Sequence, residues 1–184
     1  MKVMIKTMMK RLFLIGISAL LSGCSIMSLS DDLVDRSMIL VGLGPNHVES
    51  IGVMTIAGNA RHATAFEIAF AYGDAAQAVV SGSEVSLWFE ERMGFCRSYA
   101  NQLDVIRVEL PMGYSAQLDN LPKGHKGAQA IWVFSEGLGK ADLTTFTTPW
   151  IVVSEEGLSV TEAPPGAMEA GKTLVADKGV KKLC

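Results

Sequence analysis

The chain has 184 residues, 49% of them hydrophobic, and its 16 basic and 19 acidic side chains give a formal net charge of −3. This length is enough for one domain with a sizeable core. The acidic balance and the lack of a basic stripe argue against a nucleic-acid-binding protein.

The first residues have the pattern of a secretory signal. Lys2, Lys6, Lys10 and Arg11 precede an apolar run from Leu12 to Leu21, with no acidic residue among them. A charged segment, a short apolar segment and small residues in this order are typical of such a signal. The run is too short to cross a bilayer, which takes about 20 apolar residues.

The apolar run ends in Leu21-Ser22-Gly23-Cys24, which resembles the lipobox of bacterial lipoproteins. The resemblance implies that residues 1–23 are a signal peptide and that Cys24 becomes an acylated N-terminus. An ordinary cleaved signal with a chance cysteine is the alternative. Two or more acyl chains anchor a protein stably to a membrane. Ser25 stands where lipoproteins retained in the inner membrane have Asp, which implies the outer membrane, facing the periplasm.

Two further cysteines, Cys96 and Cys184, follow in the rest of the chain. In an oxidising compartment such a pair can form a disulfide. The alternative is that Cys96 is a small buried side chain and Cys184 a free terminal thiol. We expect no metal site, because neither cysteine has a second one two residues away. His47, His62 and His125 lie scattered in loop-like sequence and are expected to be solvated.

A β-rich periplasmic domain is predicted over residues 48–161. Residues 24–47 are mixed and weakly patterned, and are expected to form a lipidated N-terminus and tether. The apolar run Ile51–Ile56 and the alternating segment Ala65–Tyr72 are typical of strands. The polar segment Ala57–Thr64 between them is expected to be a loop.

A helical insertion is predicted at about residues 74–100. Asp74–Val80 is rich in alanine and favours a short helix, and Ser83–Tyr99 favours a longer one. Spacings of four, four and three predict a buried helix face made of Val85, Phe89, Met93 and Cys96. The expected polar face consists of Glu90, Glu91, Arg92 and Arg97. A strand is the alternative for the first half of this segment, where Val85, Leu87 and Phe89 alternate.

The following segments are again typical of strands. They are Val105–Leu110, Tyr114–Leu118, Ala128–Phe134, Trp150–Ser154 and Leu158–Thr161. Ile106, Val108 and Leu110 are expected to point inward. Several short strands with turn signals about ten residues apart predict a mainly β fold, a sandwich or small barrel, with an α+β fold as the alternative. The pattern is lost from Glu162 onward, so residues 162–184 are expected to form a flexible tail.

Gly166–Thr173 matches the P-loop expression G-x-x-x-x-G-K-T. A working P-loop needs a buried strand before it and a helix after it. Here Pro164 and Pro165 precede the match and Gly179 would end a following helix early, so we predict no nucleotide site. No G-x-S-x-G or H-E-x-x-H pattern occurs elsewhere, and we expect neither a cofactor nor enzyme activity.

The order of these elements resembles the outer-membrane lipoprotein of type VI secretion systems, the TssJ family. A lipobox precedes a strand, a loop with Gly58-Asn59, a second strand, a helical insertion and a run of strands. Leu110-Pro111-Met112-Gly113 corresponds to the proline-glycine pair that ends a strand in the family. Gly127–Phe134 corresponds to the family's apolar central strand. The chain departs from the family pattern at Ala60, where the family has proline.

The resemblance implies a transthyretin-like β-sandwich with a helical insertion. It also implies that the protein binds the periplasmic region of an inner-membrane subunit through an exposed interstrand loop. In that loop Asn59, Arg61 and His62 are the expected partner-binding residues, and Arg61 can pair bidentately with a carboxylate. The simpler interpretation is that Gly58-Asn59 only makes a turn.

Two other functions stay open. A pilotin-type lipoprotein would escort a secretin to the outer membrane by gripping a short segment of it. A periplasmic enzyme or small-ligand binder would need a pocket with convergent polar groups, and the sequence predicts none.

Overall fold

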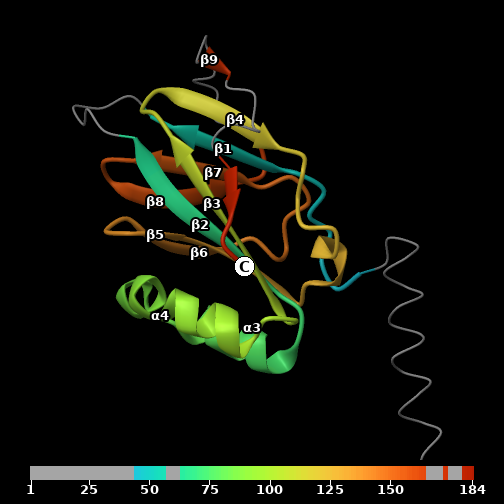
Figure 1. Cartoon of the computed structure of the whole chain (residues 1–184). Coiled ribbons are helices and arrows are strands. Elements are labelled where there is room, and N and C mark those ends of the chain that lie inside the picture. The colour runs from blue at the N-terminus through green and yellow to red at the C-terminus, as the bar shows by residue number, and fades with distance from the viewer. Residues whose placement is uncertain (1–43, 57–62, 165–171, 174–179) are drawn as a thin grey trace, which may run out of the picture. The chain divides into compact units, whose positions relative to one another are not determined.

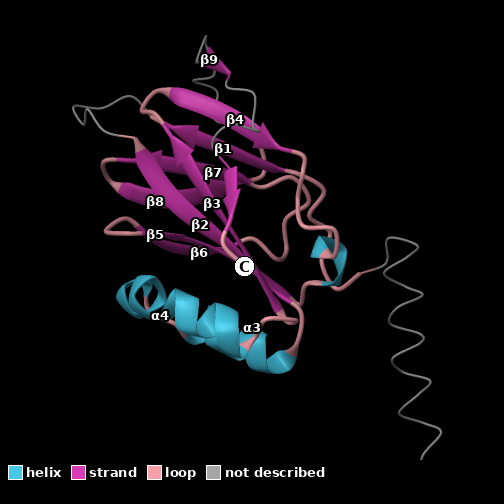
Figure 2. Cartoon of the chain, in the orientation of Figure 1, coloured by secondary structure: helices cyan, strands magenta, loops and turns pink. Residues whose placement is uncertain are grey.

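The computed structural model describes residues 44–56, 63–164, 172–173 and 180–184. These residues form two five-stranded sheets and two α-helices (Figures 1 and 2). The prediction of a mainly β sandwich with a helical insertion is confirmed. The predicted signal peptide and most of the predicted tether lie outside the described residues.

Sheet A contains the first strand of the domain at its centre. Its strands, in spatial order, are β8 (Gly157–Thr161), β7 (Trp150–Ser154), β1 (Ile51–Thr55), β4 (Tyr114–Leu118) and β9 (Lys172–Thr173). β1 is antiparallel to β4 and parallel to β7. Gly52 is paired with Trp150, and a Cβ at Gly52 would collide with the Trp150 ring. Glycine at this position therefore allows the indole to lie across β1.

Sheet B is antiparallel throughout and has β2 at its centre. Its strands, in spatial order, are β10 (Val180–Lys182), β3 (Leu103–Leu110), β2 (Thr64–Ala71), β5 (Ala130–Ser135) and β6 (Gly139–Asp142). In this register Glu67 of β2 lies between Arg107 of β3 and Phe134 of β5. The three side chains therefore share one face of the sheet.

The main core fills the space between the two sheets. Period-two alternation places one side of each strand inward, and the predicted inward residues Ile106, Val108 and Leu110 are all buried there. The sheets also meet at one edge, where the backbone N–H of Leu158 donates to the carbonyl of Leu138 at 3.0 Å. This contact joins β8 to the turn between β5 and β6, and it closes that side of the sandwich.

Helices α3 (Asp74–Gly82) and α4 (Val85–Ser98) cover the outer face of sheet B (Figure 1). A second core forms there between the helices and the sheet. Ala69 and Ala71 of β2 contribute short side chains to it, which leaves room for Trp88 of α4 and for α3. Among the described residues, no helix is long and apolar enough to cross a membrane.

The predicted buried face of α4 is right in part: Cys96 is buried and Phe89 packs against the second core. It is wrong for Met93, which is 49% exposed, and it lacks Trp88, which is fully buried. Arg92, which was expected on the polar face, is only 27% exposed and faces sheet B. The reason is that Trp88, the largest apolar side chain of the helix, takes the central buried position. The helix is therefore rotated about its axis relative to the predicted face.

The predicted tether between residues 24 and 47 extends too far. Asn46 is 1% exposed, and its side-chain amide donates to the carbonyl oxygens of His125 at 2.6 Å and Ala128 at 2.9 Å. The side-chain oxygen Oδ1 of Asn46 accepts a hydrogen bond from the backbone N–H of Val48 at 3.1 Å. Because these three hydrogen bonds hold the buried amide, Asn46 belongs to the domain and not to the tether.

The predicted flexible tail is also wrong for the parts that the structure describes. Lys172–Thr173 pairs with β4 as β9, and Val180–Lys182 pairs with β3 as β10. The backbone N–H of Leu183 then donates to the carbonyl of Val105 at 2.8 Å. These strands are too short and too polar to have a strand pattern of their own, and long-range pairing determines them.

Candidate functional site

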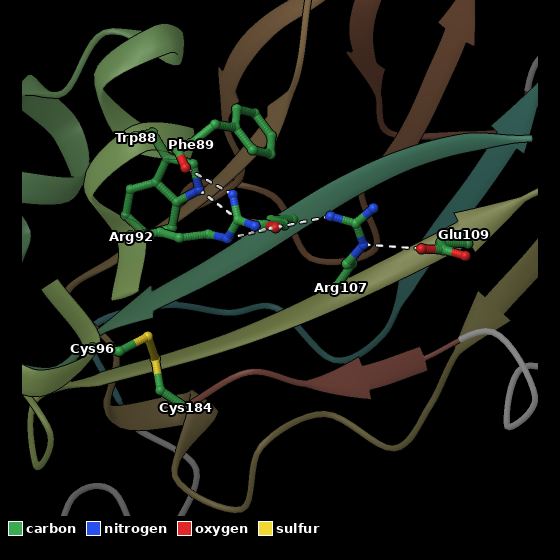
Figure 3. Close-up of polar contacts among 8 residues, drawn as sticks. Trp88, Phe89, Arg92, Cys96, Arg107, Glu109 and Cys184 are labelled. Carbon is green, nitrogen blue, oxygen red and sulfur yellow. Dashed lines mark hydrogen bonds and ion pairs between the residues drawn. A yellow bond between two sulfur atoms is a disulfide. The ribbon is translucent and has the colours of Figure 1, made fainter. Parts of the chain in front are cut away.

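One buried carboxylate organises the contact between α4 and sheet B. Glu67 in the middle of β2 is fully buried, and its Oε2 accepts the indole N–H of Trp88 at 3.0 Å. Its Oε1 lies 3.3 Å from Nε of Arg92 and 3.4 Å from Nη1 of Arg107 (Figure 3). We call these four residues the Glu67 cluster.

The members of the Glu67 cluster are fixed by further contacts. The Trp88 ring stacks on Phe134, with ring centroids 4.4 Å apart and ring planes within 8°. Nη1 of Arg92 donates to the carbonyl of Phe89 at 2.8 Å, and its guanidinium lies over the Phe89 ring. Both carboxylate oxygens of Glu67 therefore have charged or polar partners, as a buried acid requires. The cluster joins helix to sheet and leaves no carboxylate oxygen free to act as a general base.

A disulfide joins the same helix to the C-terminus. Cys96 of α4 and Cys184 are bonded, with a Cα–Cα distance of 5.6 Å and a sequence separation of 88 (Figure 3). Of the two alternatives that the sequence left open, the structure contains the bridged pair. Together with the Leu183 backbone bond, the disulfide fixes β10 to sheet B and to α4.

Replacing Cys96 with serine is expected to lower the free energy of unfolding by about 2 to 4 kcal/mol, because a crosslink over a long loop restricts the unfolded chain. Chemical denaturation of protein isolated without reductant measures this difference. Non-reducing mass analysis provides the control, because oxidised wild-type protein should have no alkylatable thiol at Cys96 or Cys184. Two alkylatable thiols there, or an unchanged unfolding midpoint in the variant, would contradict a structural disulfide.

A cleft of about 580 Å³ lies between the two sheets on the side where β4 and β10 face each other. Its apolar lining consists of Ile106, Leu118, Leu121, Pro122 and Val180, and its polar lining of Asp104, Asn120, Lys123 and Lys182. A cavity of this size and lining is typical of a binding site for a small molecule or a peptide side chain.

The polar wall of the cleft is built around Asp104 of β3. The Tyr72 hydroxyl donates to Oδ2 of Asp104 at 2.8 Å, and Nζ of Lys182 lies 2.6 Å from Oδ1. Burial, followed by the hydrogen bond and charge of Asp104, raises the pKa of Tyr72 above its ordinary value. The phenol therefore stays protonated and remains a donor to Asp104. Both oxygens of Asp104 are thus engaged, and its charge is compensated by Lys182.

His125 differs from the solvated histidine that the sequence predicts. Its side chain is partly buried, with Nδ1 3.0 Å from the carbonyl of Pro122 and Nε2 buried without a hydrogen-bond partner. His47 is exposed, as predicted. Within the described part of the chain, no three His, Cys, Asp or Glu residues come close enough to hold a metal ion.

The other residues predicted from sequence lie mostly beyond the described ranges. These are the lipidation site Cys24 and the partner-binding residues Asn59, Arg61 and His62. Lys172 and Thr173 of the P-loop match form a strand, whereas in a P-loop they begin a helix. No family model, curated protein or solved structure matches the chain. The resemblance to type VI lipoproteins, the lipobox and the partner loop therefore stay predictions.

Proposed function

We propose that this chain is a lipoprotein of the outer membrane, anchored through acylated Cys24 and facing the periplasm. There it anchors a secretion-system envelope complex of the type VI kind by binding the periplasmic region of an inner-membrane subunit. The observation that carries the proposal is the lipobox-like Leu21–Cys24 in front of a disulfide-bonded β-sandwich.

The disulfide supports the proposed location. Structural disulfides persist in oxidising compartments such as the periplasm and are rare in the bacterial cytosol. The Cys96–Cys184 bond joins α4 to the last residue of the chain. A secretory signal and a disulfide are independent features of the sequence and of the fold, and both agree with export.

The attachment of the predicted partner loop supports the proposed binding role. Residues 57–62 connect β1 of sheet A to β2 of sheet B. At one end, the Thr55 hydroxyl donates to the carbonyl of Pro111 at 2.5 Å, and the N–H of Ile56 donates to Val153 at 2.8 Å. At the other end, Thr64 pairs with Leu110. The residues that flank this connection are therefore fixed in the two sheets, and connections on a rigid scaffold are common binding sites.

A structural rather than enzymatic role is part of the proposal. The buried carboxylate of Glu67 and the partly buried carboxylate of Asp104 both have their oxygens engaged by neighbouring side chains. Groups held this way stabilise the fold and are poorly placed to exchange protons with a substrate.

Alanine at Asn59, Arg61 and His62 together is expected to weaken capture of the inner-membrane subunit's periplasmic region by about tenfold or more, because interface energy concentrates in a few residues. Co-purification from membranes, followed by titration of the purified pair, measures the loss. The matched control has alanine at Glu136, Glu156 and Glu162, which are exposed in other loops, and it should capture the subunit as well as wild type does.

Undiminished capture by the folded loop variant would place the interface elsewhere. If the wild type captures a secretin and not the subunit, the protein is a pilotin-type lipoprotein and the proposal is wrong.

A further inference from the structure

The C-terminal strand β10 is an edge strand that is unusually well fixed. It is the outermost strand of sheet B, and among the described residues no strand pairs with its other side (Figure 1, red strand ending at C). Three residues at the end of a chain would ordinarily fray. Here the Leu183–Val105 hydrogen bond and the Cys96–Cys184 disulfide hold the end of the strand. The backbone groups on its outer side are therefore held in an extended conformation.

The cleft lies directly beside this edge. Val180 and Lys182 of β10 form one wall, Ile106 of β3 adjoins them, and Leu118 lies opposite on sheet A. Val180 and Lys182 are paired with Val108 and Ile106, whose side chains point into the space between the sheets. A strand added along β10 would thus turn every second side chain toward the cleft, whose apolar lining includes Ile106, Leu118 and Val180.

Three lysines surround the edge. Lys182 is 63% exposed and compensates Asp104. Lys123 at the cleft and Lys181 on the opposite face of β10 are exposed and make no ion pair with a described residue. Lysines on an edge strand also prevent identical edges from pairing. In a chain with more acidic than basic side chains, the exposed Lys181, which has no ion pair with a described residue, additionally favours acidic groups of a ligand on the face of β10 opposite the cleft.

We propose that β10 and the adjoining cleft bind an extended peptide segment of alternating aliphatic and acidic residues, which adds to sheet B as a further strand. Backbone hydrogen bonds to β10 supply affinity, as in other cases of strand addition. The aliphatic side chains enter the cleft, while the carboxylates, which alternate to the other face of the sheet, face Lys181. The proposal rests on the proposed function in that the segment belongs to the protein partner, and the segment binds at a site separate from the 57–62 loop.

The test uses the full chain in detergent and a fluorescein-labelled peptide of alternating valine and glutamate, followed by fluorescence anisotropy. Saturable binding is expected. A peptide with the same residues in two blocks should bind about tenfold more weakly or worse, because the alternation is lost. N-methylation of the backbone nitrogens along one edge should abolish binding when that edge faces β10, and methylation of the other edge should leave it intact.

Reversing the charge with Lys181→Glu should weaken binding several-fold at low salt. Lys181 is exposed, and circular dichroism verifies that the variant is folded. Arg97→Glu is the matched control, because Arg97 is exposed in the last turn of α4, and it should bind like wild type. The proposal would be overturned if the alternating peptide shows no saturable binding or if the block peptide binds as tightly as it does. Equal binding of the two methylated peptides, or binding to the charge-reversed variant as tight as to wild type, would overturn it as well.

The subunit-capture experiment and the peptide-binding experiment together distinguish the β10 site from the proposed function. Capture of the inner-membrane subunit without peptide binding refutes the β10 site alone. Peptide binding without capture of the subunit retains the β10 site and refutes the proposed anchoring role.

Discussion

Replacing Glu67 with alanine is expected to lower the free energy of unfolding by about 3 kcal/mol, since it removes the common partner of three side chains. The Trp88 indole N–H would remain buried without an acceptor, and Arg92 and Arg107 would face each other across an empty site. The side chains of Arg92 and Arg107 are 27% and 31% exposed and can partly turn to water, which limits the cost. Urea denaturation followed by tryptophan fluorescence measures the change.

Two further substitutions make this result specific. Glu67→Gln keeps an acceptor for Trp88 and removes only the charge, so its loss of stability should be smaller than that of alanine. Glu109→Ala is the matched control, because Glu109 is also on sheet B and pairs with Arg107 at 3.0 Å but is 59% exposed. Exposed pairs contribute little, and the control should change stability by less than about 1 kcal/mol. If Glu67→Ala is no worse than Glu109→Ala, the cluster does not hold α4.

The sandwich could be predicted from the sequence because alternation of apolar residues is a local signal. Ile106, Val108 and Leu110 follow each other at period two, and one buried face is enough to determine their orientation. Segments such as Trp150–Ser154 and Gly157–Thr161 are joined by a short turn, so their pairing follows from their distance along the chain. These features need no information from distant parts of the sequence.

The Glu67 cluster could not be predicted in the same way. A single acid in the apolar segment Ala65–Tyr72 suggests a special role, but its three partners lie between 21 and 40 residues away in sequence. The orientation of α4 depends on those partners, and a hydrophobic face calculated from the helix alone assigns Met93 to the interior and Arg92 to solvent. Burial of Trp88 and the pairing of Trp88 and Arg92 with Glu67 reverse both assignments.

The cleft is equally non-local. Its walls come from β3, β4, the loop at residues 120–123 and β10, which are brought together only when the two sheets pack. The strand β10 reads Val-Lys-Lys and has no pattern that predicts a strand. Its conformation follows from pairing with β3 and from the disulfide across 88 residues. Even so, the two cysteines are visible in the sequence, which leaves their pairing open as one of two alternatives.

Replacing Cys24 with serine is expected to abolish labelling of the protein with radioactive palmitate and to release it from the outer-membrane fraction. The thiol of Cys24 is the predicted acceptor of the first lipid group, and serine has no thiol. Each buried CH₂ of an acyl chain contributes about 0.8 kcal/mol to membrane binding, so the loss of two or more chains removes the whole anchor. Labelling of growing cells followed by density-gradient separation of the two membranes measures both effects.

Matched variants show whether Cys24 itself is responsible for the palmitate labelling and for the membrane attachment. Cys96→Ser removes another cysteine and should leave palmitate labelling intact, because Cys96 is disulfide-bonded to Cys184 within the domain. Ser25→Asp should keep the label and move the protein to the inner membrane, since aspartate at that position retains lipoproteins there. Continued labelling and sedimentation of the Cys24→Ser protein with membranes would mean that the anchor is elsewhere. In that case the proposed outer-membrane role would lose its basis.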